Sequence, residues 1–283
     1  MFDWLIASIP ILTFGFIPVI AARVGGKASE QAAGISIGSF VFAFTLMFFR
    51  QPNFDTQSLT ISFISGVFWV TGSFTQFKSM EYLGVSKSMP ISACGQIVGT
   101  SLAGVCMGDW SSTISKIYGF SALLFIIIGI IFTSYKEVND KKLNWKKGII
   151  YNIISSVGFT AYISILRAYG ISGWDSILPQ SIGQIAGICI ISLLLFRSLP
   201  FSRSAIKNSV TGLSWGVGNI SLMIAQASLG LAVAYPVSQA SVIISIIGGV
   251  LINHESKNLK EWLSATLGML FIVFGLILIY MST

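Results

Sequence analysis

Charged residues are scarce in this chain of 283 residues. Only 10% are Asp, Glu, Lys or Arg, and there is a single histidine. Soluble globular domains carry about 25% charged residues. Here 54% of the residues are hydrophobic and the mean hydropathy is +0.82. These values exclude an ordinary soluble domain, because the apolar segments have no polar face wide enough to meet water. The composition predicts an all-α polytopic membrane protein.

The chain also lacks the residue sets on which most enzymes and metal sites depend. It has no phosphate-binding Gly-rich loop with Lys, no metal-ligand cluster and no Ser/His/Asp set, and His254 lies at the end of an apolar segment. The three cysteines, Cys94, Cys106 and Cys189, lie within apolar segments without metal-ligand spacing, which is typical of packing residues. We therefore expect no enzyme activity, no cofactor and no metal.

Ten apolar segments cover nearly the whole chain. A hydrocarbon core about 30 Å thick takes about 20 helical residues. The predicted spans are 4–22, 31–49, 58–78, 84–107, 115–134, 148–168, 176–196, 209–229, 232–252 and 262–282. The loops between them are too short for a catalytic or nucleotide-binding domain.

Basic residues are distributed unequally between the two sides of such a bundle. Only Arg50, Lys116 and Arg167 fall on one side. The other 14 are Arg23, Lys27, Lys78, Lys87, Lys136, Lys141, Lys142, Lys146, Lys147, Arg197, Arg203, Lys207, Lys257 and Lys260. The positive-inside rule places the basic side in the cytoplasm and both termini outside the cell. The net charge of +7 thus indicates contact with membrane lipid and not with nucleic acid.

The second half of the chain repeats the first. An offset of 146 residues aligns Trp69 with Trp215 and Pro90 with Pro236, without a gap. The longest polar run, 136–147, separates five spans from five. An odd number of spans per repeat inverts the second copy. We therefore predict ten transmembrane helices in two inverted five-helix repeats, 1–137 and 148–283, joined by a cytoplasmic linker, 138–147.

All ten acidic residues map to helix ends or loops. An ionisable group in the middle of a span would mark a proton relay or an ion pathway, so its absence favours a neutral substrate. For proton coupling, the candidates are Glu81 at the end of the third span and Asp175 at the start of the seventh. The alternative for each is a solvated helix cap or a partner of a nearby lysine.

The spans instead contain carboxamides and tryptophans. A buried amide without a partner is costly in lipid, so each must face another helix or a wet cavity. The amides in or beside the spans are Gln76, Gln96, Gln180, Gln184, Asn219, Gln226 and Gln239. Amides can pair with sugar hydroxyls, and the equivalent Trp69 and Trp215 could stack on a sugar ring. Interhelical hydrogen bonding by the amides and ordinary packing by the tryptophans are the alternatives.

Two prolines occupy equivalent places near the starts of the fourth and ninth spans. Pro90 and Pro236 each remove a backbone hydrogen bond, which frees carbonyl groups or creates a hinge. Because both repeats have one, we predict a gating bend at each.

Several motifs are similar to those of a known family. They are Gly25-Gly26-Lys27, Gln31-x-x-Gly34-x-x-x-Gly38, Ser65-Gly66-x-x-Trp69, Met89-Pro90-Ile91-Ser92, Gln96, Pro179-Gln180, Trp215-Gly216, Ala225-Gln226, Ser238-Gln239 and Gly248-Gly249. Together they resemble the bacterial glucose/ribose porter family of sugar uptake proteins, within the drug/metabolite transporter superfamily. The run Gly15-Phe16-x-Pro18 is more similar to the ribose uptake branch than to the glucose branch.

The resemblance implies a secondary transporter of the cytoplasmic membrane that imports ribose or glucose by alternating access, often described as a proton symporter. Superfamily analogy lines the cavity with spans 1, 3, 4, 6, 8 and 9. That analogy selects Trp69, Gln76, Gln96, Trp215, Asn219 and Gln239 as substrate-binding residues, and the family match alone adds Gln180. The chain departs from the family around His254 and Glu255. The alternative functions are a superfamily exporter of amino acids or metabolites and a membrane scaffold that does not transport.

Overall fold

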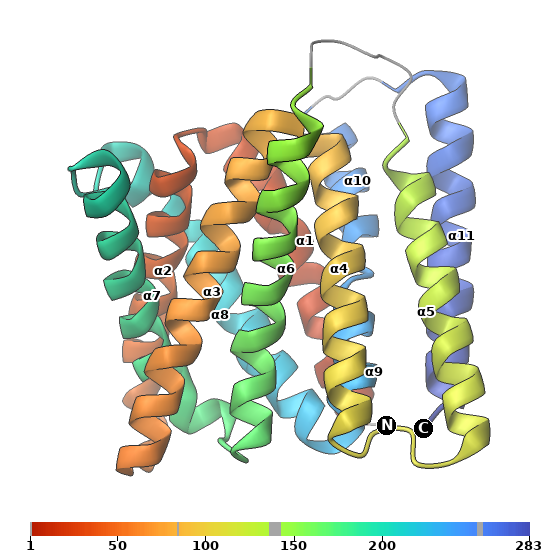
Figure 1. Ribbon diagram of the computed structural model, residues 1–283, viewed down its shortest axis with the longest axis horizontal. Coiled ribbons are helices and arrows are strands. Elements are labelled where there is room, and N and C mark those ends of the chain that lie inside the picture. Colours follow the sequence, from red (N-terminus) through yellow and green to blue (C-terminus); the bar gives the residue numbers. More distant parts are fainter. Residues whose placement is uncertain (1, 84, 136–142, 254–256) are drawn as a thin grey trace.

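The computed structural model describes residues 2–83, 85–135, 143–253 and 257–283. All regular structure in these residues is helical, and successive long helices run in alternating directions (Figure 1). The helices are α1 (Phe2–Val24), α2 (Ala28–Met47), α3 (Thr56–Leu83), α4 (Val85–Cys106), α5 (Thr113–Thr133), α6 (Trp145–Ala168), α7 (Gly173–Phe196), α8 (Arg203–Leu229), α9 (Leu231–Ser238), α10 (Ser241–Asn253) and α11 (Leu259–Met281).

Nine segments of the described chain are long and apolar enough to cross a membrane, with α9 and α10 together forming one of them, Leu231–Ile252. This confirms the all-helical, polytopic part of the prediction. Helix α8 is not among the nine. It carries buried polar residues such as Asn208 and Asn219 and packs against α1, α2 and α9. Because neighbouring helices cover it, α8 needs less apolar surface than the others.

Three helices, α3, α5 and α7, begin two or three residues before the predicted spans, where a short polar side chain caps them. Ser112 accepts a hydrogen bond from the Ser115 amide (3.0 Å), and Ser172 accepts one from the Asp175 amide (3.2 Å). Asp55 caps α3, accepting from the Ser58 hydroxyl (2.7 Å) and amide (2.8 Å). These bonds stabilise the carboxylate and lower the pKa of Asp55. Caps, and not hydropathy, therefore set these helix starts.

The ninth predicted span, 232–252, is not one continuous helix. Gln239 and Ala240 form a turn between α9 and α10, and their amides donate to carbonyls three residues earlier, those of Pro236 (3.1 Å) and Val237 (3.1 Å). Pro236, which has no N–H to donate, lies just before this break. Pro90 lies inside a continuous α4. The two equivalent prolines therefore have different effects on helix shape.

The helices pack in two groups (Figure 1). α5 and α11 pack closely on each other, and a Cβ at Gly129 would lie 2.7 Å from the Gly268 carbonyl oxygen. In the larger group α3 packs against α6 and α7, and α8 packs against α1 and α2. Gly38 and Gly212 bring α2 and α8 into close contact, since a Cβ at Gly212 would lie 2.7 Å from the Gly38 Cα.

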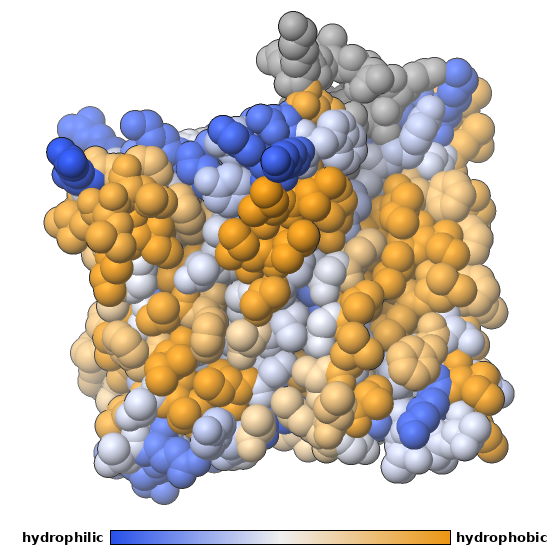
Figure 2. Space-filling view, viewed as in Figure 1, coloured by the Kyte–Doolittle hydropathy of each residue, from blue (hydrophilic) through white to orange (hydrophobic). Residues whose placement is uncertain are grey.

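The two ends of the bundle differ in charge. Both termini lie at one end, here called the terminal end (Figure 1). At the opposite end, here called the basic end, hydrophilic residues form a band above the apolar surface (Figure 2). The basic end carries Arg23, Lys27, Lys78, Lys146, Lys147, Arg197, Arg203, Lys207, Lys257 and Lys260. Lys136, Lys141, Lys142, His254, Glu255 and most of the predicted linker 138–147 lie outside the described residues.

Candidate functional site

Two tryptophans meet inside the larger helix group. The rings of Trp69 on α3 and Trp215 on α8 have centroids 4.5 Å apart at an angle of 55°. Their exposed fractions are only 3% and 5%. α3 packs mainly on α6 and α7, and α8 mainly on α1 and α2, so the two indole rings bridge helices whose backbones otherwise hardly approach. The two aromatic faces that the sequence repeat paired are thus in direct contact.

A cluster of hydrogen-bonded side chains lies on one side of the tryptophans. Gln180 on α7 donates to the Ser65 hydroxyl (2.8 Å) and accepts from the Asn219 amide (2.7 Å). Ser65 in turn donates to the Tyr162 carbonyl (2.6 Å). Ser65 precedes Trp69 by one turn of α3, about 6 Å toward the terminal end. We call Ser65, Gln180 and Asn219 the terminal-side amide cluster.

A second cluster joins α3, α4 and α9. Gln76 and Gln96 both donate to the Ser92 hydroxyl, at 2.9 and 2.8 Å. The Tyr235 hydroxyl donates to the Gln96 Oε1 (2.7 Å). Gln76 follows Trp69 by seven residues, about 10 Å toward the basic end. We call Gln76, Ser92, Gln96 and Tyr235 the basic-side amide cluster. The tryptophan pair thus lies between two polar clusters along α3.

One predicted binding residue lies apart from both clusters. Gln239 is half-buried in the turn between α9 and α10, and no hydrogen bond within the described residues joins its side chain to either cluster. Its place follows from the break after Pro236, which the sequence repeat did not reveal. The structure therefore brings six of the seven predicted binding residues into the tryptophan pair and its flanking clusters.

The two predicted proton-coupling residues lie at helix ends. Glu81 is in the last turn of α3, where it forms an ion pair with Lys78 (2.7 Å) and remains 47% exposed. Asp175, in the first turn of α7, accepts from the Ser172 hydroxyl (2.6 Å) and from the backbone N–H of Asn53 (2.7 Å). These are the contacts of a surface ion pair and of a helix cap, and neither carboxylate reaches the tryptophan pair.

A carboxylate that sequence reasoning did not select is more deeply placed. Asp109 follows α4, and its side chain is 9% exposed. It accepts from Arg167 (2.6 Å) at the end of α6 and from the Ala232 amide (2.9 Å) at the start of α9. Arg167 also donates to the Gln226 carbonyl on α8. This ion pair therefore joins four segments at the terminal end, beyond the terminal-side amide cluster. The one hint of this ion pair in the sequence is that Arg167 is among the few cations at the terminal end.

Ser65, Ser92 and Tyr235 are further residues that sequence reasoning missed. Both serines stand in the family motifs, but serines are frequent in these spans and the motifs did not indicate that these two bond to glutamines. Within the described part of the chain no group of His, Cys, Asp or Glu could hold a metal ion. The arrangement offers neutral donors and acceptors on both sides of an aromatic pair, which is the chemistry that binds a neutral, hydroxyl-rich ring.

Several known proteins are similar to this chain over nearly its whole length. The sequence model of the family described as sugar transport protein matches residues 5–282. A Listeria monocytogenes protein, lmo0169, provisionally named a sugar uptake protein, is 39% identical over 273 residues, which cover 95% of each chain. The glucose uptake protein GlcU of Bacillus subtilis is 37% identical over 276 residues, 96% of this chain and 95% of that one. The fold is similar to a protein crystal structure at 12% identity, with a TM-score of 0.75, over 98% of this chain and 95% of the other.

Proposed function

Because this chain belongs to the sugar transport protein family, we propose that it imports a small neutral sugar, ribose or glucose, by alternating access. The observation that carries the proposal is the contact of Trp69 with Trp215 between two buried amide clusters. An indole face binds the C–H surface of a sugar ring, and the amides bind its hydroxyls. The relative named for glucose uptake makes glucose the first sugar to test.

The packing supports two inverted repeats, 1–137 and 148–283. Exchanging α1 with α6, α2 with α7, α3 with α8, and α4 with α9 and α10 turns each main helix contact into another. The contact of α3 with α7 becomes that of α8 with α2, and α1 with α10 becomes α6 with α4. Equivalent helices run in opposite directions (Figure 1). On this proposal α8 is the tenth crossing, and the repeats exchange conformations around the tryptophan pair.

The charge distribution supports an orientation in the cytoplasmic membrane with the basic end inside. Ten described Lys and Arg residues lie at the basic end, and Arg50, Lys116 and Arg167 lie at the terminal end. By the positive-inside rule both termini are outside the cell, and 138–147 is a cytoplasmic linker. Sugar would then bind from the terminal end and leave at the basic end.

Transport by the purified protein in liposomes tests the function. Labelled glucose, ribose and a neutral amino acid are offered separately to right-side-out and inverted proteoliposomes. We expect saturable uptake of one sugar, inhibited by the unlabelled sugar. Saturable transport of the amino acid alone would identify an exporter of the superfamily type. No saturable transport of any of the three would favour a membrane scaffold and contradict the proposal.

A further inference from the structure

Two buried glutamines one turn apart on α7 differ in their hydrogen bonding. Gln180 and Gln184 are both 0% exposed. Gln180 uses both ends of its amide, toward Ser65 and Asn219. Neither the Nε2 nor the Oε1 of Gln184 has a partner among the described residues. A buried donor and acceptor without partners destabilise a fold. Gln184 therefore needs an explanation that structural hydrogen bonding does not give.

The helical spacing puts Gln184 on the face of α7 that packs against α2 and α8. Ile177 lies two turns before Gln184 on the same face of α7 and packs with Ala43 of α2 and Ile220 of α8. On α2, which runs in the opposite direction, Ser39 lies one turn from Ala43 toward the basic end. The Ser39 hydroxyl is also buried without a partner among the described residues. Both α2 and α7 thus carry a buried polar side chain without a partner among the described residues, on the basic side of the apolar contact of Ile177 with Ala43.

A cavity lies at the basic end of α2, α3 and α7. The cavity has a volume of about 490 Å³, within the range of about 300–1,000 Å³ that small-molecule pockets occupy. Ser29 of α2 and Ser192 of α7 line it, and Lys27, Glu30, Lys78 and Glu81 surround its mouth. Ser192 is 1% exposed, and its hydroxyl has no partner among the described residues. We call Ser29, Ser39, Gln184 and Ser192 the α2–α7 seam.

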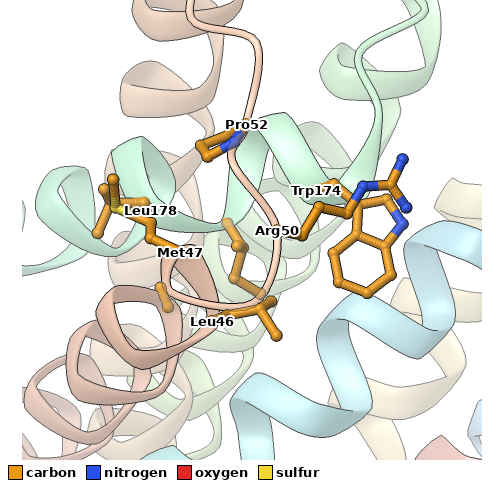
Figure 3. A pocket seen from close by; sticks show the side chains of 8 residues that line it. Leu46, Met47, Arg50, Pro52, Trp174 and Leu178 are labelled. Carbon is orange, nitrogen blue, oxygen red and sulfur yellow. The ribbon is translucent and has the colours of Figure 1, made fainter.

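The opposite end of the contact between α2 and α7 is mainly apolar. Leu46 and Met47 of α2 lie against Trp174 and Leu178 of α7 in a small pocket (Figure 3). The Arg50 guanidinium lies over the Trp174 ring, 4.6 Å from the ring centroid. Polar residues therefore line the basic end of α2 and α7, and mostly apolar residues line the terminal end of their contact.

We propose that the α2–α7 seam is the route by which the sugar passes from the tryptophan pair to the basic end, with Gln184 as the hydrogen-bonding residue midway. The inference rests on the proposed function and adds a path to it. A sugar entering the seam would pair both ends of the Gln184 amide and then the Ser192 hydroxyl. The cavity is lined by two lysines and two glutamates, so their charges cancel. A cavity without net charge suits a neutral polyol and not an ion.

The first test compares two substitutions of one type on one helix. Methionine replaces glutamine with an apolar side chain of similar length. Gln184→Met should raise Tm by about 2–4 °C and slow sugar uptake at least about threefold, because it removes an unpaired amide that the sugar needs. Gln180→Met should lower Tm, because Ser65 and Asn219 lose their partner. A lower Tm for Gln184→Met, or unchanged uptake by it, would overturn the inference.

The second test maps the seam with cysteines in a Cys106→Ser background. Ser192→Cys should react with a bulky, impermeant thiol reagent from the basic side only, and the reaction should block uptake. Leu46→Cys, at the apolar end of the contact between α2 and α7, should stay unreactive from the terminal side. An unreactive Ser192→Cys, or modification without effect on uptake, contradicts the route. If the wild-type protein imports no sugar, the proposed function fails, yet the Tm comparison and the labelling still decide whether the seam is an accessible polar path.

Discussion

Asp109 and Arg167 form an ion pair of 2.6 Å in which each residue also binds backbone of the second half of the chain. Asp109 accepts from the Ala232 amide, and Arg167 donates to the Gln226 carbonyl. The start of α9 is thereby fixed to the end of α6 and to the segment after α4. In the proposed orientation this pair lies outside the sugar site, where it would hold the outer end closed.

Breaking this pair should destabilise the protein. Asp109→Asn leaves the partly buried guanidinium without its carboxylate, and we expect a loss of about 1–3 kcal/mol, measured by thermal unfolding in detergent. The exposed Lys78–Glu81 pair is the control, and Glu81→Gln should cost less than about 1 kcal/mol. The exchange Asp109→Arg with Arg167→Asp should not restore stability, because arginine cannot accept from the Ala232 amide. Full restoration would mean that only the charges matter.

The tryptophan pair should report sugar binding. Trp69→Phe keeps an aromatic ring but reduces the face available to a sugar, and we expect binding about three- to tenfold weaker with little loss of folded protein. Titration of the wild-type protein with sugar should change tryptophan fluorescence, and Trp69→Phe should reduce that change. Trp262→Phe, at a helix end, is the matched control and should bind sugar normally. Equal affinity of the wild-type protein and Trp69→Phe would make Trp69 a packing residue.

Amides from the two clusters should matter for binding more than for folding. Gln96→Ala and Asn219→Ala each remove a hydrogen-bonding group, worth about 0.5–1.5 kcal/mol, or roughly three- to tenfold in affinity. Sugar binding is measured in detergent by titration, beside the yield of monodisperse protein. Normal affinity in both variants would show that these amides hold helices together and do not contact the sugar.

Cysteine labelling tests the orientation. In a background with Cys106→Ser, Lys146→Cys in the first turn of α6 should react with an impermeant reagent only when the cytoplasmic side is exposed. Thr283→Cys should react in intact cells, because the positive-inside rule places the terminal end outside. The half-buried Cys94 and Cys189 give the background, measured without added cysteines. Labelling of position 146 in intact cells would reverse the topology.

Hydropathy predicted most of the long helices, because crossing a membrane requires long apolar segments. Neither hydropathy nor the internal repeat could predict the break between α9 and α10. Pro90 and Pro236 look equivalent in sequence, but a proline near a helix start is tolerated and only the packing decides whether a turn follows. The observed starts of α5 and α7 differ from the predicted span starts by two or three residues, because Ser112 and Ser172 cap these helices.

The candidate site was predictable in part for a related reason. Polar residues in apolar spans are conspicuous, so Gln96, Gln180 and Asn219 could be selected from the sequence. Ser65 and Ser92 stand in the family motifs, but their pairing with these amides could not be predicted, because serine is common in these helices and its partner depends on which helix lies opposite. Gln180 and Gln184 look equally polar in the sequence. Only the structure separates the paired amide from the unpaired one.

Energy coupling is the property for which residue chemistry and family resemblance differ. The resemblance implies proton symport, which requires a group that changes protonation as sugar binds. Glu81 is paired with Lys78 at the surface and Asp175 caps α7, so neither contacts the amide clusters. We therefore expect Glu81→Gln and Asp175→Asn to leave sugar transport within about twofold of wild type, since exposed pairs and caps contribute little beyond stability.

The measurement is sugar accumulation in proteoliposomes under an imposed inward proton gradient. If the protein is a facilitator, internal sugar rises to the external concentration and no further, and a protonophore has no effect. Accumulation above that level, abolished by the protonophore, would establish symport. In that case the two substitutions locate the coupling group, because the variant of a coupling residue would still equilibrate sugar but would no longer concentrate it. Accumulation retained in both variants would direct the search to Asp109, whose carboxylate already links the two halves of the chain at the terminal end.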